Sequence, residues 1–161
     1  MWKTQLLLLL ILASAIAVLP GKAGATAQKQ ETGYLCQPTP EDEMGPFYRP
    51  GAPLRSQIGE GYLLTGTVKS AVDCTGISAS LIEFWQADHD GRYDDAHRAA
   101  VITGESGYYR LETDVPGEYL TRPAHIHIRV SAPGFRTLVT QHYLHQGATS
   151  SVFDLALIPV P

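Results

Sequence analysis

The chain has 161 residues, a formal net charge of −4 at pH 7 and a charged fraction of 17%. This length suits one domain, and a mildly acidic chain without a basic stripe lacks the electrostatic signature of a nucleic-acid-binding protein. Composition alone does not identify a small-molecule ligand.

Residues 1–27 are predicted to be a cleaved signal peptide. Lys3 supplies a positive start, residues 6–19 form an almost unbroken apolar run, and Ala25-Thr26-Ala27 offers a cleavage site. A membrane-spanning helix needs about 20 apolar residues, which favours cleavage after Ala27 over an uncleaved anchor. We therefore expect an exported protein, periplasmic or extracellular, that is free of the membrane after cleavage.

The mature segment contains two cysteines, Cys36 and Cys74. In an oxidising compartment a disulfide is their default state, and closing a loop of this length would stabilise the fold by about 4 kcal/mol on the chain-entropy model. The sequence leaves open whether the bond forms within one chain or between two. We expect a structural role for both residues.

Residues 28–60 are rich in Pro, Gly and charge and are predicted to form an extended N-terminal arm. Residues 61–161 contain short runs of β-favouring residues bounded by turn signals, which predicts an all-β, antiparallel β-sandwich. Asp94–Val101 is a short helical candidate. The expected strands are Tyr62–Lys69, Ser80–Ala87, Tyr108–Thr113, His125–Ser131, Thr137–Leu144 and Val152–Ile158.

The fourth expected strand carries two imidazoles. Successive side chains of a strand point to opposite faces, so His125 and His127 share one face. The pair indicates either a metal site or two half-buried histidines that bind nothing. His142 and His145 on the next strand are three residues apart and face opposite ways, so they do not form a second pair of ligands.

Two tyrosines favour the metal. Tyr93 and Tyr119 lie in or beside turns, from which a side chain can reach back over a strand end. A phenolate is a hard anionic donor, and two phenolates with two imidazoles suit iron(III) better than zinc or copper(I). Taken alone, each tyrosine is more often a half-buried aromatic with its hydroxyl in water.

Several motifs, in their order along the chain, resemble those of the intradiol ring-cleavage dioxygenases, the family of protocatechuate 3,4-dioxygenase and catechol 1,2-dioxygenase. The resemblance covers nearly the whole mature chain. The motifs are MGPFYRPGAPLR (44–55), TGTV (65–68), EFWQADHDGRY (83–93), PGEY (116–119), RPAHIHIRV (122–130) and LVTQHYL (138–144).

The resemblance implies a role for each matching residue. Tyr93, Tyr119, His125 and His127 match the ligands of one Fe(3+) per chain, and Tyr119 matches the ligand that leaves when substrate binds. Arg122 matches the arginine that stabilises charge on the bound catecholate. Gln141 matches a glutamine near the same pocket. The alternative for Arg122 is a surface salt bridge, but its place three residues before His125 favours the functional role.

The implied activity is cleavage of a catechol ring between its two hydroxylated carbons with O2, giving a muconate-type dicarboxylic acid. The alternatives are a non-catalytic β-sandwich binding module and a zinc or copper site on the same scaffold. Only Leu120 and Thr121 separate Tyr119 from Arg122, where many family members have a longer segment. The identity of the catechol therefore stays open, and so does the oligomeric state, a homo-oligomer included.

The remaining candidates have structural explanations of equal or greater weight. Pro46, Phe47 and Tyr48 would either wall the pocket or pin the arm to the sandwich. Trp85 is expected in the core. The acidic segment 88–95 lacks the ligand spacing of a calcium loop and is expected to be a turn that presents Tyr93. His89 and His97 are expected at the surface.

Overall fold

The computed structural model describes residues 33–118 and 120–161, which contain strands and turns and no helix. The predicted signal peptide and Tyr119 lie outside the described residues. The strands are β1 (Tyr62–Ser70), β2 (Leu81–Ala87), β3 (Tyr93–Ile102), β4 (Tyr108–Thr113), β5 (His125–Ser131), β6 (Leu138–Tyr143), β7 (Ser150–Val152) and β8 (Leu155–Leu157).

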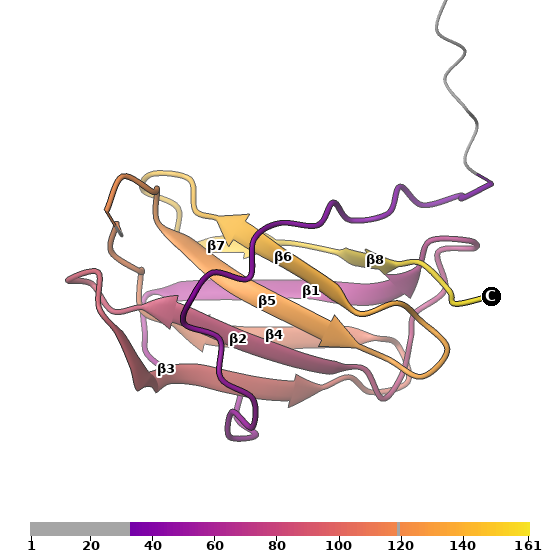
Figure 1. Ribbon diagram of the computed structural model, residues 1–161, viewed down its shortest axis with the longest axis horizontal. Coiled ribbons are helices and arrows are strands. Elements are labelled where there is room, and N and C mark those ends of the chain that lie inside the picture. Colours follow the sequence, from indigo (N-terminus) through magenta and orange to yellow (C-terminus); the bar gives the residue numbers. More distant parts are fainter. Residues whose placement is uncertain (1–32, 119) are drawn as a thin grey trace, which may run out of the picture. The chain divides into compact units, whose positions relative to one another are not determined.

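The strands form two layers (Figure 1). One sheet has the order β3-β2-β5-β6 and is antiparallel throughout. The other has β1 at its centre, with β4 antiparallel on one side and β7 and β8 parallel on the other. The predicted all-β sandwich is thus confirmed. Its second sheet is mixed, because the chain returns to β1 in the same direction after the long passage through the first sheet.

The core lies between the layers and follows from strand alternation. In β1, buried residues alternate with half-buried ones along the whole strand. In β5, Ile126, Ile128 and Val130 are fully buried and face the opposite sheet. The alternation leaves His125 and His127 on the outer face of their sheet.

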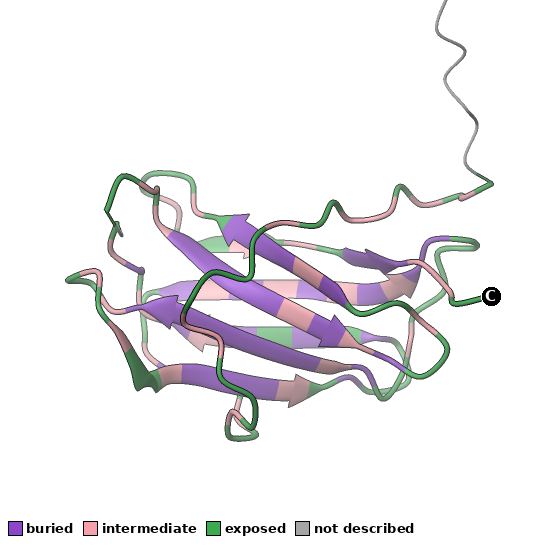
Figure 2. Cartoon of the chain, in the orientation of Figure 1, coloured by how far each residue is buried: buried purple, intermediate pink, exposed green. Residues whose placement is uncertain are grey.

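That outer face is covered by the N-terminal arm. The arm crosses the strands of the β3-β2-β5-β6 sheet (Figure 1), with hydrogen bonds from Asp42 N to Val139 O of β6 (2.9 Å) and from Ala100 N of β3 to Pro53 O (2.8 Å). As a result β2 and β5 are buried on both faces along most of their length, as Figure 2 shows. The two imidazoles are therefore inside the protein although they lie outside the sandwich core.

The short helical candidate Asp94–Val101 is not a helix, because these residues belong to β3. From Arg98 onward the strand pairs with β2, and Ala99 is fully buried against the core. The register shifts between Trp85 and Ala87, so that Tyr93 lies opposite Ala87 where an unbroken ladder would place Ala96. Helix-favouring alanines in this segment were overridden by strand pairing and burial.

The other predicted strands are confirmed to within a residue or two, with one exception. The expected strand Val152–Ile158 is divided into β7 and β8, because Asp154 turns its side chain to β1, where Oδ1 accepts from Thr67 N (3.0 Å) and Oδ2 from Lys69 Nζ (2.7 Å).

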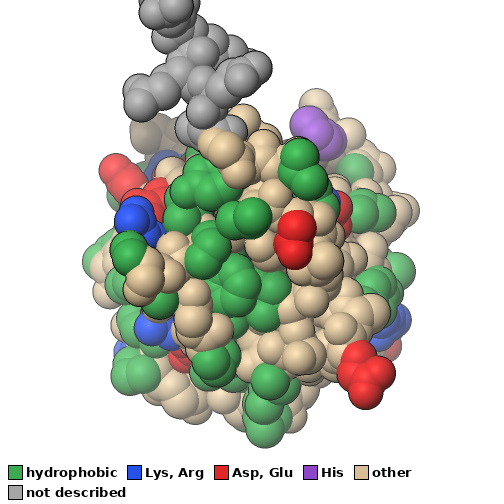
Figure 3. Space-filling view, turned by 90° about the vertical axis from the view of Figure 1, so that its right-hand side faces the viewer, with side chains coloured by type: hydrophobic (Ala, Val, Ile, Leu, Met, Phe, Trp, Pro, Cys, Tyr) green, Lys and Arg blue, Asp and Glu red, His purple; other side chains and the backbone are tan. Residues whose placement is uncertain are grey.

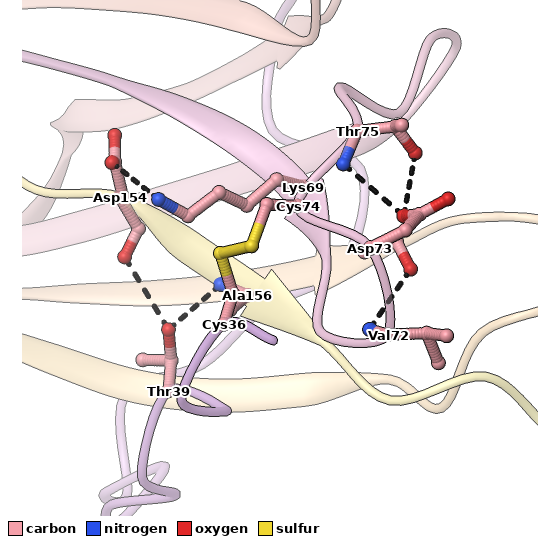
Figure 4. The surroundings of a disulfide bond; sticks show 10 residues. Cys36, Thr39, Lys69, Val72, Asp73, Cys74, Thr75, Asp154 and Ala156 are labelled. Atoms are coloured by element: carbon pink, nitrogen blue, oxygen red, sulfur yellow. Dashed lines mark hydrogen bonds and ion pairs between the residues drawn. A yellow bond between two sulfur atoms is a disulfide. The ribbon is translucent and has the colours of Figure 1, made fainter. Parts of the chain in front are cut away.

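A disulfide between Cys36 and Cys74 ties the arm to the β1–β2 connection within one chain (Figure 4), with a Cα–Cα distance of 5.4 Å. Beside it, Thr39 Oγ1 donates to Asp154 O (3.3 Å) and accepts from Ala156 N (2.8 Å). The start of the arm is therefore joined to β8 and the β1–β2 connection by covalent and hydrogen bonds together.

The end of the sandwich at which β5 terminates carries exposed hydrophobic side chains (Figure 3), and Val72 and Val160 in the segments at this end are 43% and 49% exposed. In the described part of the chain, no helix is long and apolar enough to cross a membrane. His125, the first residue of β5, lies at the opposite end of the sandwich.

Candidate metal centre

Three side chains converge on one point on the outer face of the β3-β2-β5-β6 sheet. The hydroxyl oxygen of Tyr93 lies 3.4 Å from His125 Nε2 and 3.1 Å from His127 Nε2, and the two Nε2 atoms are 3.1 Å apart. Three polar atoms from two strands, β3 and β5, thus form a triangle with sides of 3.1–3.4 Å.

Strand geometry explains this convergence. His125 and His127 alternate with the core residues of β5, so both point to the outer face. The bulge in β3 places Tyr93 opposite Ala87, next to the strand that pairs with β5. The sequence predicted the shared face of the two histidines and the turn beside Tyr93.

His125 is oriented by a hydrogen bond. Its Nδ1 donates to the carbonyl oxygen of Pro123 (2.6 Å), which leaves the lone pair of Nε2 directed at Tyr93 and His127. Burial lowers the pKa of His125, and the charge of Arg122 lowers it further against the opposing effect of the Pro123 bond. The ring is therefore neutral near pH 7, the form that binds a metal.

His127 is oriented by packing. Its ring stacks on the indole of Trp85, with centroids 4.9 Å apart and planes at 6°, and Gly45 of the arm lies against its Cε1 atom. Its buried Nδ1 has no hydrogen-bond partner among residues 33–118 and 120–161. Burial, with His125 second, lowers the pKa of His127 to about 3, so this ring is neutral as well.

The donor set fits a metal ion of the iron(III) type. Two donor atoms about 2.1 Å from a common ion and at right angles to each other lie about 3 Å apart, which is the spacing of the three atoms here. Two neutral imidazoles and a phenol oxygen suit iron. The described residues contain no group of three or more His, Cys, Asp or Glu side chains that could hold a metal, so a tyrosine is required for a third protein ligand at this point.

A pocket of about 260 Å³ opens over the three atoms. It is lined by Glu43, Gly45, Pro46, Phe47, Tyr93, Leu120, Arg122, His125 and His127. A larger cavity of about 550 Å³ is lined in part by Pro123, Ala124 and His145, and none of the three converging side chains lines it. The smaller pocket is therefore the candidate site.

Arg122 and Gln141 meet at the rim of this pocket. Arg122 Nη2 donates to Gln141 Oε1 (2.9 Å) and to the hydroxyl of Tyr143 (2.8 Å). Gln141 lies opposite His127 in the β5–β6 ladder, and its Nε2 donates to the carbonyl oxygen of Glu43 (2.6 Å). The guanidinium is thus held in place by two strand residues beside the imidazole pair.

The structure also decides the open alternatives for the arm and the core. Pro46 and Phe47 line the pocket, and Phe47 stacks on Tyr93 with centroids 4.2 Å apart. Tyr48 instead pins the arm, because its hydroxyl donates to Glu83 Oε2 (3.1 Å). Trp85 is buried as expected, but its contact with His127 makes it part of the site.

The other histidines lie elsewhere. His89 is exposed, as expected. His97 is not a free surface residue, because it bridges Asp94 and Asp114 with its side chain 12% exposed. His142 faces the core and bonds the Tyr62 hydroxyl (2.8 Å), and burial, with His145 second, lowers its pKa to about 4. The predicted ligand Tyr119 lies outside the described residues.

Sequence reasoning missed Glu43, Gly45 and Leu120 in the pocket lining and Tyr143, which bonds Arg122. Tyr143 was detectable, because it lies two residues after Gln141 on the same strand and therefore on the same face. Glu43 and Leu120 lie in the arm and in a connection, where no periodicity indicates which way a side chain points.

Comparison with known proteins identifies the family of the chain. Residues 49–155 match the family model described as Dioxygenase. The chlorocatechol 1,2-dioxygenase of Cupriavidus pinatubonensis (strain JMP 134 / LMG 1197) is 30% identical over 172 residues, which cover 75% of this chain and 67% of that protein. The chain thus spans about two-thirds of the length of this relative.

Two solved structures share the fold. The dioxygenase domain of a dioxygenase carbohydrate-binding protein fusion from Streptomyces sp. SirexAA-E has a TM-score of 0.70 and 30% identity over 77% of this chain and 100% of that one. An intradiol ring-cleavage dioxygenase from Tetranychus urticae has a TM-score of 0.72 and 19% identity over 78% of this chain and 97% of that one. Since the family model also covers most of the sequence, the chain belongs to the intradiol ring-cleavage dioxygenase family.

Proposed function

We propose that this protein is an iron(III)-dependent dioxygenase that opens a catechol ring between its two hydroxylated carbons with O2. The observation that carries the proposal is the triangle formed by Tyr93 Oη, His125 Nε2 and His127 Nε2, with sides of 3.1–3.4 Å, at the base of a pocket. Family membership supports the same conclusion, and so does the name of the Cupriavidus relative.

Tyr93, His125 and His127 would hold the iron, with Tyr119 as the fourth ligand that the family resemblance predicts. Bound iron(III) supplies a Lewis acid that favours the deprotonated catecholate and draws electron density from its ring. Both imidazoles are neutral near pH 7 because their pKa values are lowered by burial. Tyr119 would accept a proton from the incoming catechol, which is the role of a general base.

Arg122 would stabilise negative charge that develops on the substrate. Its guanidinium lines the pocket and is fixed by Gln141 and Tyr143, so it needs little reorganisation during the reaction. Preorganised donors of this kind are commonly worth about 3–4 kcal/mol of transition-state stabilisation. The side chains of Pro46, Phe47 and Leu120 would hold the apolar ring and exclude water.

We also propose that the protein is exported. The sequence pattern of residues 1–27 supports this, and so does the Cys36–Cys74 disulfide, since disulfides persist mainly in oxidising compartments.

The proposal predicts a coloured, oxygen-consuming protein. Iron-loaded protein should absorb visible light, take up O2 with a catechol and release a ring-opened dicarboxylic acid. Tyr93→Phe should shift or bleach the visible band, because a tyrosinate ligand is removed, whereas Tyr108→Phe on the exposed side of β4 should leave it unchanged. A colourless protein that binds zinc at full occupancy, or an unaltered band in Tyr93→Phe, would contradict the assignment.

A further inference from the structure

A second pocket, lined by charged side chains, lies where the N-terminal arm runs along β3. It has a volume of about 380 Å³ and is lined by residues 49–53 and Arg55 of the arm and by Asp95 and Arg98 of β3. None of these residues lines the pocket over the candidate metal centre. Three arginines and one aspartate give this lining a formal charge of +2, although the whole chain has a net charge of −4.

Arg98 supplies the buried charge of this pocket. Its side chain is 6% exposed, and its Nε lies 3.3 Å from Asp95 Oδ1. Within the part of the chain that the structure describes, its Nη atoms form no hydrogen bond. A guanidinium carries five N–H donors, and burying a charge is costly unless it is paired and hydrogen-bonded. The Nη donors of Arg98 are therefore left for a ligand in the pocket.

Asp95 does not neutralise the arginines around it. Its Oδ1 is shared between Arg49 Nη1 (3.0 Å) and Arg98 Nε, and its side chain is 78% exposed. One carboxylate thus serves two guanidiniums, and water screens its attraction to both because it lies at the surface.

Arg55 is held in place by backbone carbonyls. Its Nε donates to Arg98 O (2.9 Å), and its Nη2 donates to Ala96 O (2.7 Å) and to Arg98 O (2.7 Å). These carbonyl oxygens orient the guanidinium but carry no formal charge. The positive charge of Arg55 is therefore preorganised at the pocket without being balanced there.

We infer that this pocket binds a small free oxyanion with two negative charges, of the sulfate or phosphate type. Guanidinium groups recognise such oxyanions through pairs of parallel, charge-assisted hydrogen bonds. The charge of the anion would balance the formal charge of the lining. Because Arg49 and Arg55 belong to the arm and Arg98 belongs to β3, the bound anion would join the arm to the sheet. The same arm carries residues 45–47, which line the pocket over the candidate metal centre.

The test is calorimetric titration of the iron-loaded protein with sulfate, at an ionic strength kept constant with chloride. One saturable site per chain is expected, and the visible band should not move, because the anion binds away from the iron. Arg49→Gln removes one positive charge and should weaken sulfate binding about fivefold, as expected for one charge at contact distance in water. Asp95→Asn removes the competing carboxylate and should tighten binding by a similar factor. Simple disruption of the Arg49–Asp95 ion pair would change the affinity in the same direction in both variants.

Arg92→Gln and Asp90→Asn are the matched controls, because they alter another exposed ion pair (2.8 Å) that does not line this pocket. Both should leave the affinity for sulfate unchanged. Arg98→Lys keeps the buried charge but removes the Nη donors, and it should weaken binding at least as much as Arg49→Gln. If this buried substitution prevents folding, the exposed Arg49 and Asp95 variants still decide the question.

Three results would overturn the inference: no saturable binding of sulfate, an affinity in Arg49→Gln equal to that of the unmodified protein, or weaker binding in Asp95→Asn. A shift of the visible band on addition of sulfate would also contradict it, because the anion would then be bound at the iron. These outcomes concern a separate pocket and leave the proposed ring cleavage intact.

Discussion

The Nδ1 atom of His127 has no hydrogen-bond partner in the described part of the chain. The ring is instead held by packing, with the indole of Trp85 on one face and Gly45 of the arm close to its edge. His125 differs, since its Nδ1 donates to a backbone carbonyl. Most metal-binding histidines use the second nitrogen in that way. The orientation of His127 therefore depends on the arm staying in place.

Gly45→Ala should displace His127. A Cβ at this position would lie 3.1 Å from His127 Cε1, and the backbone φ of 68° adds strain of about 1–2 kcal/mol for a non-glycine residue. Gly51→Ala provides a matched control, because its φ is 83° but a Cβ there would meet nothing within 4 Å. Both variants should lose similar unfolding free energy in urea titrations, but only Gly45→Ala should shift the visible band and weaken iron binding. Identical spectra for the two variants would show that His127 does not depend on this contact.

At the scale of elements, the bulge of β3 is what brings Tyr93 to the imidazoles. The bulge is held by His97, whose Nδ1 lies 2.7 Å from Asp94 Oδ1 and whose Nε2 lies 3.3 Å from Asp114 Oδ2. Asp114 directly follows β4, in the other sheet. His97 therefore connects the segment that carries Tyr93 to the opposite layer.

This connection predicts a pH-dependent contribution to stability. Burial alone would lower the pKa of His97, but its bonds and charge interactions with Asp94 and Asp114 outweigh burial and raise it. Because the pKa is higher in the folded state, the stabilisation is fully present below the unfolded pKa of about 6.5 and is lost as pH rises through the folded pKa. Urea unfolding from pH 5.5 to 8.5 should show that His97→Asn reduces stability most at the acidic end. A His97→Asn deficit that is constant with pH would contradict the prediction.

At the scale of the whole described sandwich, the site depends on three parts that are distant in sequence. The sheet supplies the imidazoles, the bulge supplies Tyr93, and the arm closes the outer face with Gly45, Pro46 and Phe47. The disulfide fastens the beginning of this arm to the β1–β2 connection. The arm is therefore a covalently tethered cover of the pocket.

Removing the Cys36–Cys74 bond should reduce the unfolding free energy by about 4 kcal/mol, because the unfolded chain gains entropy when the loop opens. Chemical reduction of the unmodified protein and the Cys36→Ser/Cys74→Ser double variant should give the same denaturant midpoint. A loss below about 1 kcal/mol would mean that the unfolded chain is already restrained in this region.

Much of the fold could be predicted from the sequence, because side chains alternate between the two faces of a strand and short residue patterns therefore identify strands. The alternation in residues 125–130 determined that the two imidazoles share a face, and the short strands separated by turn signals determined the all-β class. The resemblance of the RPAHIHIRV and EFWQADHDGRY segments to the family identified the candidate ligands. These features depend on neighbours in the chain.

The tertiary structure alone decided which residues complete the pocket. The helical pattern of Asp94–Val101 was overridden by pairing with β2, the arm's path put Glu43 at the rim, and Trp85 acquired a contact with His127. Each of these features depends on contacts between segments that are far apart in sequence. The free energy of such contacts exceeds local secondary-structure propensity, and the contacts produce no periodic pattern in the sequence.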